Sequence, residues 1–147
     1  MNQRSHFTMT CLFALGTLFP VVVLRAAVPN QSVENLQKNA THIVVGKVTK
    51  IGHDTTTSGN YEETKYVAEI SVTSVEKGEG IIVNEVIKVR YGQRKWIGAG
   101  SPPPGSNGHR GLPKKDGTNR VYLKKVKGRG YDVEFPNGFE SIKPDEK

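Results

Sequence analysis

Cysteine is nearly absent from this 147-residue chain, because the single Cys11 lies in an apolar amino-terminal stretch and no other cysteine follows it. A disulfide framework of the kind that stabilises many small secreted domains is therefore excluded. Leucine, alanine and methionine are also scarce after residue 27, where 3 Leu, 3 Ala and no Met stand against 14 Val and 8 Ile. Because β-branched residues favour strands and the scarce residues favour helices, this composition argues against an all-helical fold.

Long apolar runs are confined to the amino terminus. Residues 11–24 are almost wholly apolar and follow a short polar segment that carries Arg4. This run is shorter than the roughly 18 to 20 residues that a transmembrane helix needs, and its arrangement is typical of a secretory signal peptide. We expect residues 1–27 to be a signal peptide with cleavage near Ala27. The rest of the chain is then periplasmic or extracellular with no transmembrane segment, and its lack of cysteine is more typical of a bacterial envelope protein than of an animal extracellular one.

The remaining 120 residues contain 36 apolar side chains, which is enough for one modest core and therefore for one domain. Ser32 is a potential N-cap, and Val33, Leu36 and Ala40 follow it at spacings of three and four. This pattern predicts a short helix within residues 28–40, which we interpret as a linker. Residues 41–147 are expected to form a single β domain.

Five stretches of the domain have the β-branched or alternating pattern of strands. They cover residues 41–51, 66–77, 86–91, 120–125 and 131–135. Gly46, in the middle of the first stretch, predicts a β-bulge. Residues 52–60 are interpreted as a polar loop. Residues 92–117, which include 7 Gly and 4 Pro, predict a long irregular loop that is either functional or disordered.

The order of these elements matches an oligonucleotide/oligosaccharide-binding (OB) barrel. The fold class is therefore predicted as all-β. We expect a five-stranded OB-like Greek-key barrel with a short amino-terminal helix and a long Gly/Pro-rich loop between strands 3 and 4. From the alternation along the strands, Tyr91 and Tyr131 should point inward, which leaves Trp96 and Tyr122 as exposed rings.

Two motifs carry a resemblance to known modules. They are ATHIVVGKV at residues 40–48, and YVAEISV at residues 66–72 with VEKG at residues 75–78. They resemble netrin-like modules, tissue inhibitors of metalloproteinases and exported bacterial proteins of that shape. The resemblance covers about half of the mature chain and implies a fold but no activity. The inhibitors act through an amino-terminal cysteine, which this mature chain lacks, so their mechanism is not implied.

Charge is distributed unevenly along the chain, with a net −3 over residues 28–87, +11 over residues 88–129 and −3 over residues 130–147. If the third and fourth strands bring the ends of the basic block together, the surface would attract anionic polymers. Alternatively, the basic side chains keep the domain soluble and pair with carboxylates such as Glu62, Glu63 and Glu69. The predicted binding residues are Lys88, Arg90, Arg94, Lys95, Trp96, Arg110, Lys114, Lys115, Arg120, Tyr122 and Lys124.

Signatures of catalysis are missing from the sequence. His42, His53 and His109 lack the spacing of metal ligands, and neither a nucleophile elbow nor a phosphate-binding glycine motif occurs. We therefore predict no catalytic residue, no metal site and no cofactor. An enzymatic function would require His53, Asp54 and His109 to converge.

The leading hypothesis is a non-enzymatic exported binding or accessory module, monomeric, whose basic loop and strand ends contact an unknown protein or an anionic envelope polymer. One alternative is an enzyme-inhibitor-like domain that inserts the loop at residues 92–117 into a partner's cleft. Another is a single-stranded nucleic-acid-binding OB domain that stacks bases on Trp96 and Tyr122. Because export removes the chain from most nucleic acid, we do not expect this last function.

Overall fold

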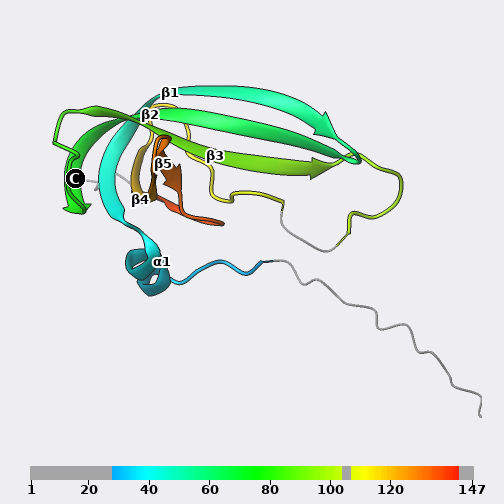
Figure 1. Cartoon of the computed structure of the whole chain (residues 1–147), viewed down its shortest axis with the longest axis horizontal. Helices are drawn as coiled ribbons and strands as arrows, with labels where there is room; N and C mark the ends of the chain where they lie inside the picture. Colours follow the sequence, from blue (N-terminus) through cyan, green and yellow to red (C-terminus); the bar gives the residue numbers. More distant parts are fainter. Residues whose placement is uncertain (1–27, 104–106, 143–147) are drawn as a thin grey trace, which may run out of the picture.

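The computed structural model describes residues 28–103 and 107–142, which form a closed five-stranded β-barrel with one short helix and a sixth strand (Figure 1). The strands are β1 (His42–Ser58), β2 (Tyr61–Lys77), β3 (Val86–Trp96), β4 (Thr118–Val126), β5 (Gly130–Val133) and β6 (Phe139–Ser141). Neighbouring strands follow the order β1-β2-β3-β5-β4, and β4 pairs with β1 to close the barrel. The predicted all-β barrel is confirmed, whereas the predicted signal peptide lies outside the described residues.

The pairing of the strands explains how five elements close into a barrel. β3 and β5 run parallel, and the other pairs are antiparallel. β5 forms a hairpin with β4 and lies between β3 and β4 in the sheet. The sheet then closes on itself where β4 pairs with β1. β6, which the sequence pattern missed, is only three residues long and adds to β4, with Val121 opposite Phe139.

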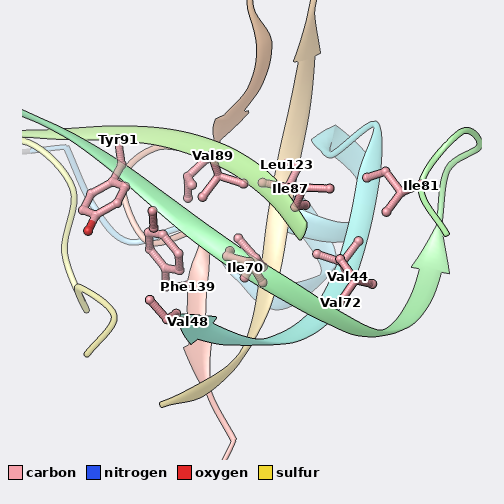
Figure 2. Close-up of a cluster of buried hydrophobic side chains, with 13 residues drawn as sticks. Val44, Val48, Ile70, Val72, Ile81, Ile87, Val89, Tyr91, Leu123 and Phe139 are labelled. Atoms are coloured by element: carbon pink, nitrogen blue, oxygen red, sulfur yellow. The ribbon is translucent and has the colours of Figure 1, made fainter. Parts of the chain in front are cut away.

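The main core fills the barrel (Figure 2). It is built from the alternating residues of β2 and β3 that the sequence pattern predicts to face inward, together with residues of β1 and β4. Its fully buried members include Val44, Ile70, Val72, Val89 and Leu123. The inward orientation predicted for Tyr91 is also confirmed, since this side chain is buried in the same cluster.

The helix α1 (Val33–Asn39) begins after Ser32, as predicted, and the Ser32 hydroxyl oxygen accepts a hydrogen bond from the backbone N–H of Asn35 at 3.3 Å. Leu36 packs with Ile43 and Tyr122 in a second, smaller cluster. Tyr122 is fully buried, so the prediction that its ring is exposed is wrong. Alternation along β4 does not reveal this burial, because α1 covers the face opposite to the barrel core.

Two predicted loop regions contain strand. β1 continues through residues 52–58 and joins β2 by a tight turn at Gly59 and Asn60, so the polar loop predicted at residues 52–60 is wrong. Thr55, Thr56 and Thr57 are β-branched and continue the ladder without an apolar alternation. β3 likewise continues to Trp96, so the start of the predicted irregular loop is strand.

These extensions form a three-stranded arm, which we define as residues 49–58, 61–66 and 91–96. β1, β2 and β3 run side by side beyond β4 and β5 in Figure 1. The β3 edge of the arm is covered by the returning chain. The backbone N–H of Arg94 donates to the Asn107 carbonyl at 2.9 Å, and that of His109 donates to the Gly92 carbonyl at 2.7 Å.

Glycines at two positions allow the barrel to close tightly. The predicted bulge at Gly46 is present as a register shift between β1 and β2, and a Cβ there would lie 2.5 Å from the Ser71 carbonyl oxygen. Gly78 has a φ of 95°, and a Cβ on it would collide with the ring of buried His42. The motifs at residues 40–48 and 75–78 therefore meet in space, and Gly78 is required by both its backbone conformation and its contact.

Candidate binding site

The structure distributes the predicted binding residues over several separate places. Arg90 lines one cavity, whereas Arg94, Lys95 and Trp96 line a second one. A third, smaller cavity of about 310 Å³ lies beside Arg110 and the buried Tyr122. The remaining predicted residues lie outside these cavities: Lys88 on β3, Lys114 and Lys115 before β4, and Arg120 and Lys124 on β4.

Several cations of the basic block are paired with carboxylates. Lys88 lies 3.8 Å from Glu69, Arg90 lies 2.8 Å from Asp132, and Arg94 pairs with Glu63. For these side chains the alternative interpretation of the charge block, neutralisation by neighbouring carboxylates, holds. Such pairs at the surface orient side chains but contribute little to stability.

Arg120 is the centre of the most extensive polar network. Its guanidinium donates to both carboxylate oxygens of Glu76, at 2.9 and 3.1 Å from Nε, and its Nη1 donates to Glu140 at 3.2 Å. The hydroxyl of Tyr122 donates to the same Glu140 oxygen at 3.0 Å. The hydrogen bonds that Arg120 donates to Glu76 and Glu140 raise the pKa of Arg120, and burial followed by the bond to Glu140 raises the pKa of Tyr122. Arg120 therefore joins β2, β4 and β6.

Five exposed lysines of the block are divided between two ends of β4, whereas Lys88 and Lys95, which are also exposed, lie on β3. Lys114 and Lys115 precede the strand, whereas Lys124, Lys125 and Lys127 lie at its far end. The exposed basic side chains are thus spread over both ends of β4 and over β3. The group at the far end adjoins the β4–β5 turn, which carries Arg129.

The cavity beside this turn is the best candidate for a ligand site. It has a volume of about 560 Å³, and we name it the β3–β5 pocket. Its walls come from β2, β3, β5, the β4–β5 turn and the segment that covers the β3 edge. The lining residues are Lys65, Tyr66, Val67, Arg90, Tyr91, Gly92, His109, Arg129, Asp132 and Val133.

Arg90 is held rigidly in the wall of this pocket. Its Nε donates to Asp132 Oδ1 at 2.8 Å, and its Nη1 donates to the Arg129 carbonyl. Its Nη2 is buried and has no hydrogen-bond partner within residues 28–103 and 107–142. Because Nη2 is buried, Arg90 attracts a ligand in the pocket through its charge and not through a hydrogen bond from this atom. Together with Arg90, the lining contains the cations Lys65 and Arg129 and the carboxylate of Asp132, so it carries an excess of positive charge.

Aromatic rings form the apolar side of the same pocket. Tyr66 and Tyr91 stack with their ring centres 4.9 Å apart, and Phe139, which belongs to the core and does not line the pocket, packs edge-on against Tyr91 at 5.0 Å. Burial, and to a lesser degree the proximity of Tyr66, raises the pKa of Tyr91 to about 12. His109 Nε2 donates to the Val133 carbonyl at 3.1 Å, and the N–H of Gly92 donates to its Nδ1 at 3.2 Å. His109 therefore joins β3 to β5 at the end of their short pairing.

A second cavity of about 520 Å³ lies along the arm and has a more polar lining. Glu62, Thr64, Gln93 and Lys95 contribute to it from β2 and β3. Trp96 reaches it from the tip of the arm, where its ring packs edge-on against Tyr61 at 5.0 Å and its Nε1 donates to the Gly100 carbonyl at 3.3 Å.

The three histidines of the described residues lie in different surroundings. His53 packs near Tyr66 at 5.9 Å and His109 packs near Tyr91 at 6.2 Å, so the stacked tyrosines lie between the two imidazoles. His42 is buried at the start of β1, where Nε2 donates to the Glu79 carbonyl at 3.0 Å. Over the described part of the chain, no three side chains among His, Cys, Asp and Glu come close enough to hold a metal ion.

The described residues include no helix that is long and apolar enough to cross a membrane. No protein-family model matches the chain, and no match to it is found among curated proteins or solved structures. The resemblance to netrin-like modules and tissue inhibitors of metalloproteinases therefore stays a prediction.

Proposed function

We propose that this chain is a non-enzymatic exported binding module with an OB-like Greek-key barrel, which holds an anionic group of its partner in the β3–β5 pocket. Two features support the OB-like type. β5 lies between β3 and β4 in a five-stranded closed barrel, and the pocket lies on β2 and β3 beside the β4–β5 turn. OB barrels bind their ligands on the face of strands 2 and 3 and at the loop between strands 4 and 5.

The observation that carries the proposal is the excess of cations in one pocket, where Lys65, Arg90 and Arg129 stand against Asp132 beside the stacked rings of Tyr66 and Tyr91. A planar guanidinium suits a carboxylate or phosphate group, and the cations Lys65 and Arg129 add attraction. The rings of Tyr66 and Tyr91 provide an apolar surface for the part of the ligand that carries the anion. This chemistry fits an acidic polymer of the cell envelope, or an acidic segment of a protein partner.

The test uses Lys65→Gln with Arg129→Gln in one variant, because both side chains are exposed and neither pairs with a carboxylate among residues 28–103 and 107–142. Binding to polyphosphate and to polyglutamate is measured by titration calorimetry across a salt series. Loss of two cations from the pocket should weaken binding roughly tenfold at low salt and reduce the salt dependence.

The matched control is Lys114→Gln with Lys115→Gln, which removes the same charge at the opposite end of β4. We expect this variant to bind with an affinity within about twofold of that of the wild-type chain. The small loss is the general effect of a lower net charge on attraction to an anionic polymer. If both variants weaken binding equally, the interaction is non-specific attraction and the pocket is not the site. If the wild-type chain binds neither polymer, the proposal for an acidic polymer is wrong.

A further inference from the structure

The two edges of the arm differ in a way that points to a partner. Residues 107–109 hydrogen-bond along the β3 edge. On the opposite side, β4 pairs with β1 only as far as Lys47, and residues 116 and 117 satisfy the backbone of Val48. From Thr49 to Ser58, no other strand of the described residues pairs with the outer edge of β1 (Figure 1). A free edge of this length is a template for another extended strand.

We propose that this edge pairs with the same edge of a second copy of the chain, antiparallel and centred on Gly52. The side chains at the edge are self-complementary in that arrangement. With Gly52 opposite Gly52 of the second copy, Lys50 of each chain lies opposite Asp54 of the other, which gives two pairs of opposite charge. Lys50 and Asp54 are exposed, and neither forms an ion pair in the described part of the chain.

The same register brings matching faces together. Ile51 and His53 lie opposite the inward-facing Ala68 and Tyr66 of β2, so they belong to the core side of the sheet. In the proposed pairing Ile51 of one copy lies opposite His53 of the other, and the core side of one arm continues into that of its partner. A shift by two residues separates Lys50 from Asp54, and a shift by one residue joins opposite faces. Charge and face therefore select one register, in which Thr49 to Thr55 of the two copies pair. Residues 56–58 must bend away from the partner, because residues 116–119 already pair with its residues 46–48.

Gly52 permits a close approach at the centre of this interface. A Cβ at this position would meet nothing nearer than the Val67 carbonyl oxygen at 4.0 Å, so the position also accepts a side chain. None of Lys50, Gly52 and Asp54 lines the β3–β5 pocket, so the pairing and the ligand site use different residues. The proposal departs from the monomer that we expect from the sequence.

Cross-linking tests the register. In the full chain carrying Cys11→Ser, Gly52→Cys should form an intermolecular disulfide under mild oxidation, because directly opposed residues of antiparallel strands have Cα atoms roughly 4.5 to 5.5 Å apart, within disulfide range. Thr56→Cys is the control, because the two copies of residue 56 would lie about 27 Å apart at roughly 3.4 Å per residue. Equal cross-linking of both variants, or none with Gly52→Cys, would overturn the proposal.

Charge exchange tests the same interface without a covalent bond. Sedimentation equilibrium is measured over a concentration series that reaches the millimolar range. Lys50→Asp and Asp54→Lys should each weaken dimerisation roughly tenfold, because each places like charges opposite one another twice. The double variant Lys50→Asp with Asp54→Lys should restore wild-type dimerisation. A wild-type chain that stays monomeric throughout, or a double variant as weak as the single ones, contradicts the proposal.

Discussion

The barrel and the arm are built from the same three strands, yet they differ in what surrounds those strands. In the barrel half of β2, Ala68, Ile70 and Val72 are fully buried and alternate with exposed or half-buried residues. In the arm half, residues 61–64 are all half-buried and the side chains are mainly polar. A backbone ladder can therefore continue without a core beneath it, provided that β-branched and aromatic cross-strand pairs support it.

The barrel and the junction with the arm also have different roles in stability and in ligand binding. Apolar burial in the barrel provides the main driving force for folding, whereas the junction between barrel and arm carries the candidate ligand site. Tyr91 lies at this junction, with the core on one side and the β3–β5 pocket on the other. Side chains of the junction and the arm that lie outside the core can therefore contact a ligand or a partner.

The largest expected difference between the two environments comes from side-chain truncation within one strand. Ile70→Ala removes a fully buried side chain of the core and should lower the free energy of unfolding by about 3 to 4 kcal/mol. Val67→Ala, at a position that is 39% exposed, should cost less than about 1 kcal/mol. Urea unfolding followed by circular dichroism measures both. Similar costs for the two variants would show that the barrel core extends to the outer face of β2.

A smaller difference is expected for glycine replacement within β1. Gly46→Ala places a Cβ 2.5 Å from a backbone oxygen and 2.6 Å from Ile70 Cγ2, so it should destabilise the fold by about 2 to 3 kcal/mol. Gly52→Ala places a Cβ no nearer than 4.0 Å to the Val67 carbonyl oxygen, which is an ordinary contact, and should be neutral or stabilise by a few tenths of a kcal/mol. Thermal unfolding of the two variants is the measurement. A tolerated Gly46→Ala would mean that β1 and β2 can separate at the bulge.

The smallest effect concerns the junction and depends on pH. Tyr91 keeps its proton in the folded state up to a pKa of about 12, whereas the unfolded chain loses it near the ordinary value of 10.0. The folded state therefore binds more protons in this window, and stability falls as the pH rises through it, by about 1 to 2 kcal/mol from this residue. Urea unfolding at about pH 9 and about pH 11 should show this loss reduced in Tyr91→Phe. An identical loss in both proteins would exclude Tyr91 as its source.

Sequence reasoning succeeded where a residue's role depends on its close neighbours in the chain. The alternation of residues 66–72, the bulge at Gly46 and the cap at Ser32 are all local patterns, and each is confirmed. It failed for residues 52–58, because a strand without a core beneath it carries no apolar alternation. It missed β6 because three residues are too few to form a periodic pattern.

The candidate site was only partly predictable. Arg90 was identified by its place in a basic block, but its companion in the wall, Lys65, lies outside that block on β2. Tyr66 and His109 were not assigned to a binding site, since their contribution depends on the pairing of β2 with β3 and of β3 with β5. Tyr66 lies opposite another aromatic residue in the ladder, and a cation lies beside the pair. Neither fact can be predicted until the register of the strands is known.

By itself, the sequence determined that this chain forms strands around one core without disulfides, because valine, isoleucine and turn glycines act through local backbone preference and burial. Only the tertiary structure decided which strands are neighbours, which charges are neutralised and where a pocket opens. Arg120 and Glu76 are 44 residues apart and Arg90 and Asp132 are 42 apart, and they meet only because the ladder brings their strands together. An ion pair forms only where two side chains are close in space. For residues far apart in the sequence, no local sequence pattern predicts that they will be close.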